Sequence, residues 1–255
     1  MTETQTIYET IVRASTFECD VNRRWKPAAF FQHLTEAAGV HASILGCGFE
    51  AMYAQNLFWV HSRMKIKFFG FPQAGDQVTI RTWPKTIQQK LFYIRDFQVL
   101  AANGTHLAAA TSAWLVMNAS TRRLVTPQSL NLNLPALTDR IGLDEPLERL
   151  TLLQPGQERL RVQAGYSAVD VLGHVNNSRY VEWICDTFTL DEYRRRSLDW
   201  IQVNYDHEIR PGEEVALLSH ESAEIPGLWG VQGLNHSNDT RAFEAVLHWR
   251  DQRDG

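Results

Sequence analysis

The chain carries the same short pattern twice, and this repetition is the strongest constraint on its fold. When the sequence is compared with itself at an offset of 150 residues, Asp20-Val21 coincides with Asp170-Val171, and Phe30 coincides with Tyr180. In both places the aspartate–valine pair precedes apolar residues at helical spacing. The self-match is short enough to arise by chance, but the parallel order of the elements that follow favours duplication of one unit.

Strand patterns follow the predicted helix in each half. Residues 64–68 alternate between apolar and polar side chains and lead into a turn at 72–76, and residues 200–205 and 211–214 repeat that order. Further strands are expected at residues 91–100, 107–117, 229–234 and 241–249. Each half thus contains a strand, a long helix and several antiparallel strands, which predicts the α+β class with the helix wrapped by a twisted sheet.

The length and the position of the prolines predict two domains. A chain of 255 residues can form one or two domains. The stretch from about Thr126 to Gly156 shows little alternation and contains Pro127, Pro135, Pro146 and Pro155. We therefore expect an N-terminal unit over residues 1–126, a linker over 127–156 and a C-terminal unit over 157–255.

Composition excludes several classes of protein. Hydrophobic residues make up 44 % and charged residues 21 %, which is typical of a globular protein, and the net charge of −4 argues against a nucleic-acid partner. Residues 1–10 lack the apolar segment of a signal peptide, and no apolar run approaches the roughly 18 residues that span a membrane. Cys19, Cys47 and Cys185 are widely spaced, which favours a cytoplasmic protein without disulfides or a metal site. No cofactor is expected.

Residues 170–177 are the first candidate for chemistry. They place Asp170, His174, Asn176 and Asn177 just before a predicted helix, where backbone N–H groups and the helix dipole favour negative charge. His174 could act as an acid, a base or a hydrogen-bond donor, although most single histidines are structural. Asp170 could orient the imidazole or hold a water, or serve only the turn. Of the two asparagines, Asn177 is favoured as the helix cap.

Glu208 is the second candidate. It lies at the end of an apolar strand, just before the turn that begins at Arg210. Alternation gives Glu208 the parity of Gln202 and Asn204, so a solvated position is a real competitor. The sequence contains no G-x-S-x-G, G-x-G-x-x-G, P-loop or H-E-x-x-H motif. Any reaction must therefore use carboxylates, imidazole and amides, with water as a reactant.

The chain resembles the acyl-acyl carrier protein (acyl-ACP) thioesterases of plants and bacteria. In the second half, the residues that match the family pattern D-x-N-x-H-V-N-N-x-x-Y-x-x-W are Asp170, His174, Val175, Asn176, Asn177, Tyr180 and Trp183. Residues Tyr205 to Glu208 match its Y-x-x-E. In the first half, Thr82-Trp83-Pro84, Ser112-Ala113-Trp114 and Thr121-Arg122-Arg123 resemble family signatures. The resemblance covers nearly the whole chain.

The resemblance implies a tandem double hotdog, in which each unit has a long helix wrapped by an antiparallel sheet. It also implies hydrolysis of the thioester that joins a fatty acyl chain to phosphopantetheine on acyl carrier protein. The family's catalytic residues fall on Asp170, His174 and Glu208. The first half would line the acyl pocket without being catalytic, because Arg24 replaces the histidine and the counterpart of Glu208 is apolar. Substrate-binding residues are then expected to be Asn176, Asn177, Trp25, Phe30, Phe31 and Trp59.

One position departs from the family pattern. The family's catalytic asparagine falls on Leu172, whose side chain cannot form a hydrogen bond. The alternatives are an acyl-CoA thioesterase or another hotdog enzyme, and a weakly active or non-catalytic acyl-binding protein. Because open sheet edges in hotdog units often pair, a homodimer is a further expectation.

Overall fold

The computed structural model describes residues 6–130, 132–150 and 156–251. The chain forms two compact units. The first unit comprises Met1–Cys19, Arg23–Trp25 and Gln32–Leu147, and the second comprises Asp20–Asn22, Lys26–Phe31 and Glu148–Gly255. Residues 20–22 and 26–31 thus belong to the second unit although they lie in the first half of the sequence. Each unit is described by itself.

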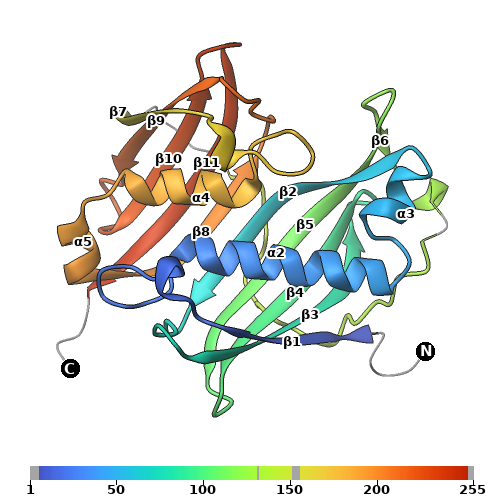
Figure 1. Ribbon diagram of the computed structural model, residues 1–255, viewed down its shortest axis with the longest axis horizontal. Helices are drawn as coiled ribbons and strands as arrows, with labels where there is room; N and C mark the ends of the chain where they lie inside the picture. Colours follow the sequence, from blue (N-terminus) through green and yellow to red (C-terminus); the bar gives the residue numbers. More distant parts are fainter. Residues whose placement is uncertain (1–5, 131, 151–155, 252–255) are drawn as a thin grey trace. The chain divides into compact units, whose positions relative to one another are not determined.

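The first unit contains an antiparallel sheet in the order β1-β3-β4-β5-β2, with the short strand β6 paired to β5. Its strands are β1 (Tyr8–Arg13), β2 (Leu57–Phe68), β3 (Gln77–Gln88), β4 (Phe92–Ala101), β5 (His106–Asn118) and β6 (Leu124–Val125). The long helix α2 (Pro27–Ile44) lies along this sheet, and the short helix α3 (Phe49–Tyr53) follows it (Figure 1). Two 3-10 turns, Thr16–Glu18 and Pro127–Ser129, complete the unit.

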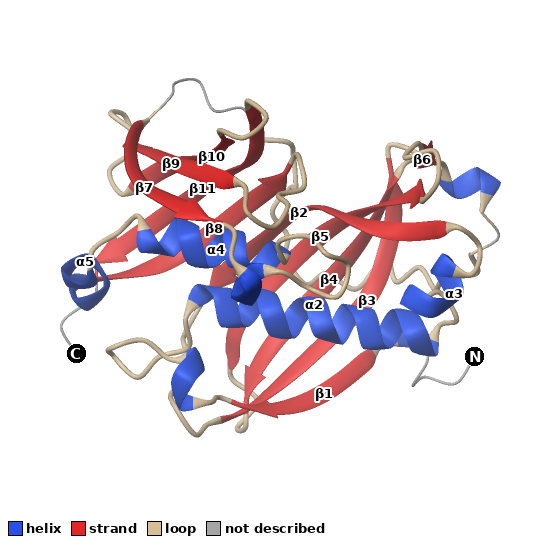
Figure 2. Ribbon diagram, turned by 45° about the horizontal axis from the view of Figure 1, so that its top comes forward, coloured by secondary structure: helices blue, strands red, loops and turns tan. Residues whose placement is uncertain are grey.

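The second unit repeats this plan with the order β8-β11-β10-β9-β7, again antiparallel. Its elements are β7 (Gln157–Gln163), the 3-10 turn Tyr166–Ala168, α4 (Asn177–Asp186), α5 (Leu190–Arg195), β8 (Arg196–Tyr205), β9 (Glu214–Glu221), β10 (Leu228–Asn235) and β11 (Thr240–Asp251). Helix α4 packs against this sheet (Figure 2), and its Tyr180 ring lies 5.1 Å from the Phe243 ring of β11. Both predicted sets of strands are present, and the expected α+β class is confirmed.

The structure preserves the sequence offset of 150 residues up to the start of each helix. The 3-10 turns begin at Thr16 and Tyr166, and the long helices begin at Pro27 and Asn177. After that point the halves diverge, because α2 has 18 residues and α4 has 10. The duplication is therefore most faithful in the loop that leads into the helix.

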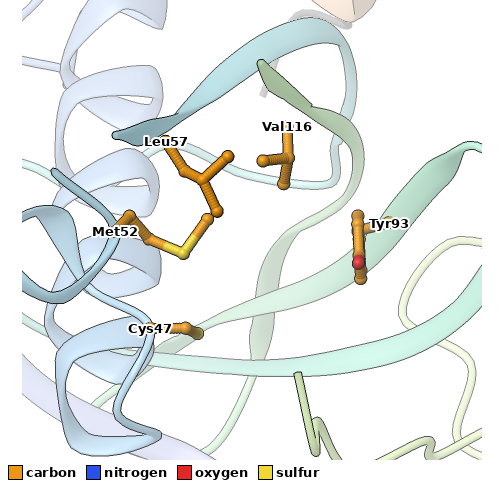
Figure 3. Packing of buried hydrophobic residues seen from close by; sticks show 5 residues of the cluster. All are labelled: Cys47, Met52, Leu57, Tyr93 and Val116. Atoms are coloured by element: carbon orange, nitrogen blue, oxygen red, sulfur yellow. The ribbon is translucent and has the colours of Figure 1, made fainter. Parts of the chain in front are cut away.

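Apolar packing in the first unit continues beyond the end of α2. Figure 3 shows Met52 and Leu57 close together, with Val116 beside Leu57 and Tyr93 across from them. Cys47, which follows the helix, belongs to the same buried cluster. Burial raises the pKa of the Cys47 thiol, so it behaves as a small apolar side chain here.

Part of the stretch predicted to be a linker packs on the first unit. The Arg140 carbonyl accepts a hydrogen bond from Trp83 Nε1 at 3.2 Å, and the Gly142 N–H donates to the buried Asp96 carboxylate at 2.8 Å. Leu143 is buried. Residues 131 and 151–155 of the predicted linker lie outside the described residues.

Candidate active site

The loop that leads into α4 is folded by its own backbone. Val169 and Val175 form an antiparallel bridge, and between them the Gly173 N–H donates to the Asp170 carbonyl at 3.0 Å. Gly173 has a φ of 78°, a conformation that glycine adopts without strain. The Asp170 N–H donates to the His174 carbonyl at 2.9 Å and closes the turn. The imidazole is thus attached to a short and strongly constrained segment.

The structure brings His174 and Glu208 together. His174 Nε2 lies 3.2 Å from Glu208 Oε2, and the two side chains are 26 % and 44 % exposed. Both groups are therefore paired and accessible to solvent, as a reaction with water requires.

A second loop, just beyond the end of β8, positions Glu208. The Val175 N–H donates to the Ile209 carbonyl at 2.9 Å, which places the chain around Ile209 beside the His174 loop. Ile209 is fully buried, and its N–H donates to the Tyr180 hydroxyl at 3.2 Å. Burial raises the pKa of Tyr180, so this hydroxyl stays neutral and accepts the bond at any ordinary pH. The sequence analysis does not assign this role to Tyr180, although the helical pattern places Tyr180 one turn into the predicted helix.

Asp170 serves the loop rather than the imidazole. Its Oδ1 accepts a hydrogen bond from the Leu172 N–H at 2.9 Å, and its Oδ2 lies 3.5 Å from Asn176 Nδ2. Within the described residues, no hydrogen bond joins the Asp170 carboxylate to the His174 ring. The geometry thus pairs two of the three predicted catalytic residues directly and places the third at the start of the turn that precedes His174.

The helix cap is Asn176, and the expectation that Asn177 forms it is wrong. Asn176 Oδ1 accepts hydrogen bonds from the Ser178 N–H at 3.0 Å and from the Ser178 hydroxyl at 2.7 Å, while Asn177 is the first helical residue. The Arg179 N–H donates to the Asn176 carbonyl at 2.9 Å. In the described structure, the Asn177 N–H is therefore the first-turn donor left for a ligand.

The aromatic residues predicted to line an acyl pocket are buried or half-buried. Trp25, Phe30 and Phe31 are fully buried. Trp59 is half-buried, donates from Nε1 to the Cys47 carbonyl at 2.8 Å and meets the Tyr93 ring edge-on. Their role in binding substrate stays a prediction.

The first half contains the same loop without the same chemistry. Cys19 and Trp25 form the bridge, and the Trp25 N–H donates to the Pro72 carbonyl at 2.8 Å, as Val175 does to Ile209. By this correspondence Phe71 stands where Glu208 stands in the second half, and Arg24 stands where His174 does. The predicted apolar counterpart of Glu208 is therefore a phenylalanine.

Within residues 6–130, 132–150 and 156–251, no three histidine, cysteine, aspartate or glutamate side chains are grouped so that they could hold a metal ion. None of the helices in these same ranges has the length and apolar character needed to span a bilayer.

Two family models match the chain. The model of the acyl-ACP thioesterase N-terminal domain matches residues 5–128, and that of the acyl-ACP thioesterase C-terminal domain matches residues 154–251. Together they account for most of the sequence.

Curated plant proteins are similar over a large part of the chain. The chloroplastic palmitoyl-acyl carrier protein thioesterase of Arabidopsis thaliana is 29 % identical over 210 residues, which are 76 % of this chain and 50 % of that protein. The chloroplastic oleoyl-acyl carrier protein thioesterase of Coriandrum sativum is 26 % identical over 245 residues, 86 % of this chain and 64 % of that protein. The chain thus spans about half to two thirds of the length of these relatives.

Solved structures show the same architecture along nearly the whole chain. An acyl-ACP thioesterase from Bacteroides thetaiotaomicron has a TM-score of 0.88 at 25 % identity and covers 98 % of this chain and 100 % of its own. The 12:0-ACP thioesterase from Umbellularia californica has a TM-score of 0.75 at 22 % identity, covering 96 % and 98 %. The expected double hotdog fold is confirmed by these structures, and the two matched domain models show that the chain belongs to the acyl-ACP thioesterase family.

Proposed function

We propose that the protein hydrolyses the thioester between a fatty acyl chain and the phosphopantetheine arm of acyl carrier protein. The products are free fatty acid and the carrier with its free thiol, and their release terminates fatty acid synthesis. The observation that carries the proposal is the pairing of His174 Nε2 with Glu208 Oε2 at 3.2 Å, in side chains that water reaches, within a member of this family.

In the proposed reaction, Glu208 holds a water molecule and accepts its proton as the water oxygen attacks the thioester carbon. The carbonyl oxygen becomes an oxyanion, which His174 and the free Asn177 N–H at the start of α4 stabilise. The carbon–sulfur bond then breaks, the carbonyl re-forms, and the departing thiolate takes a proton from solvent or from the pair. Because a thiolate is a good leaving group, the reaction depends little on acid catalysis at this step.

Asp170 is proposed to position the loop. One of its oxygens is occupied by the Leu172 N–H at 2.9 Å, and this bond holds the turn that presents His174. The alternative role, attack by Asp170 on the thioester to form an anhydride, makes a distinct isotope prediction. In a single turnover in ¹⁸O-labelled water, our mechanism leaves the Asp170 carboxylate unlabelled, whereas an anhydride opened at Asp170 would label it.

The function is tested by incubating the protein with acyl-ACP substrates of varied chain length and measuring free fatty acid and free thiol. We expect both products in equal amounts, and more rapid release from acyl-ACP than from acyl-CoA of the same chain length. Release from acyl-CoA alone would contradict the assignment of the carrier, and an absence of release from every substrate would contradict hydrolysis.

A further inference from the structure

The segment that carries His174 also carries apolar side chains that face water. Tyr166 is 99 % exposed and Val171 is 97 % exposed, and Leu172 between Val171 and Gly173 is 46 % exposed. Single exposed apolar residues are ordinary. Three of them within seven residues, on the loop that presents the candidate catalytic histidine, form an apolar surface of the kind that marks an interaction site.

The backbone holds this apolar surface in place. The Val169 N–H donates to the Tyr166 carbonyl at 3.2 Å, which fixes the 3-10 turn that presents Tyr166. Val171 and Leu172 occupy the two central positions of the turn closed by the bond from Gly173 to Asp170. The side chains are thus directed outward by a loop that has little freedom to fold them back into the core, and a ligand that covers them gains apolar burial without reorganising the loop.

The position of this surface indicates what covers it. A thioester whose carbonyl lies at His174 and Glu208 continues on its sulfur side into the pantetheine arm, a neutral chain of methylene, amide and gem-dimethyl groups. Such an arm offers apolar contacts and no charge, which suits tyrosine and valine side chains. Resting on the proposed function, we infer that Tyr166 and Val171 bind the phosphopantetheine arm of the carrier-borne substrate and hold the thioester at the His174–Glu208 pair.

The test compares one acyl chain carried on three thiols: acyl carrier protein, pantetheine, and N-acetylcysteamine, which keeps only the end of the arm. Val171→Ser and Tyr166→Ser should each raise KM about fivefold for the carrier and pantetheine thioesters, with kcat unchanged, because part of a side chain's apolar burial is lost. KM for the N-acetylcysteamine thioester should stay at the wild-type value. Both side chains are almost wholly exposed, so neither substitution removes a core contact.

The first half offers a matched control. Val21 occupies the position of Val171 in the corresponding loop and is 52 % exposed, but Arg24 and Phe71 stand there at the positions of His174 and Glu208. Val21→Ser should leave KM for all three substrates unchanged.

Three outcomes would overturn the inference. A rise in KM for the carrier substrate alone would show that the surface docks the carrier protein and not its arm. An equal rise for N-acetylcysteamine would place the residues at the reacting group, and no change for any substrate would remove them from binding altogether. Failure of the proposed function is distinguishable, because the wild-type protein would then hydrolyse none of the three thioesters.

Discussion

The loops at residues 19–25 and 169–175 have nearly the same backbone and different chemistry. In one, Asp20 accepts a hydrogen bond from the N–H two residues later at 2.8 Å, and in the other Asp170 does so at 2.9 Å. Each loop then passes through a residue with positive φ, Arg23 at 64° and Gly173 at 78°. The aspartate–turn–helix arrangement is therefore a scaffold that the fold uses twice, and it does not by itself imply catalysis.

The side chains mounted on this scaffold make the difference. The second half carries His174 and Glu208 in contact, whereas the first carries Arg24 and Phe71 at the corresponding positions. Neither a guanidinium nor a phenyl ring can accept a proton from water. The comparison teaches that two residues, set on a common backbone, separate the candidate catalytic half from its copy.

The largest effect is expected from His174→Ala. Loss of the imidazole removes the partner of Glu208 and an oxyanion donor, and kcat at saturating acyl-ACP should fall about 10³-fold. Arg24→Gln alters the corresponding position of the first half and should leave kcat within about threefold, given the assignment of the chemistry to the second half. Equal losses in the two variants, measured by fatty acid release, would contradict the division of roles between the halves.

The loops also differ at position 172, where the second loop has Leu172 and the first has Asn22, and Leu172→Asn tests this difference. In the first loop the corresponding residue, Asn22, donates from Nδ2 to the Tyr193 carbonyl at 2.8 Å. An amide at this position can therefore reach a carbonyl, and an asparagine at 172 should add a donor to the thioester oxygen. One such donor is worth about 10²-fold in kcat, so we expect a rise approaching that size. A kcat at or below the wild-type value would show that position 172 does not face the reacting carbonyl.

The halves also differ in how they use histidine, which gives a pH prediction. His61 on β2 is buried and stacked on Trp114 at 4.1 Å, and burial lowers its pKa from 6.5 to about 3. The unfolded chain therefore binds a proton at His61 that the folded chain does not, and stability falls as pH drops from about 6.5 towards 3. Between pH 7 and pH 5 this amounts to about 2 kcal/mol.

Chemical unfolding of the wild type and His61→Phe at those two pH values measures the effect. The variant keeps an aromatic ring beside Trp114 but cannot be protonated, so it should lose about 2 kcal/mol less stability than the wild type on acidification. Parallel losses in the two proteins would show that His61 does not contribute to the acid sensitivity of the fold.

The smallest effect concerns the cap of α4. Asn176→Ala removes the acceptor for the Ser178 N–H and should lower the free energy of unfolding by about 1 kcal/mol. Asn177→Ala, at the first helical position, should change it by less than about 0.5 kcal/mol. Thermal or denaturant unfolding of both variants measures these losses. A larger loss of unfolding free energy in Asn177→Ala than in Asn176→Ala would show that Asn177 is the cap.

The sequence pattern identifies the two loops and the helix starts because their signal is local. The offset of 150 residues found both loops and both helix starts, since each is formed by hydrogen bonds between near neighbours. The cap was misplaced by one residue because Asn176 and Asn177 have the same chemistry, and only the backbone decides which one precedes the helix.

Two features could not be predicted from local patterns. Alternation indicates a solvated position for Glu208, whose side chain is indeed 44 % exposed, but β8 ends at Tyr205 and alternation does not predict the contact with His174. The hydrogen bond from the Val175 N–H to the Ile209 carbonyl positions Glu208, and this bond joins segments that are far apart in the sequence. The packing of Gly142 on Asp96 within the proline-containing stretch is long-range in the same way.

The most direct test of the central claim is kcat for fatty acid release from acyl-ACP by Glu208→Gln. The amide keeps the size of the side chain and its contact with His174 but cannot accept a proton from water. We predict a fall of about 10³-fold in kcat, with KM and thermal stability close to those of the wild type. A variant that retains kcat within threefold would show that Glu208 does not activate water, and the proposed reaction centre would be wrong.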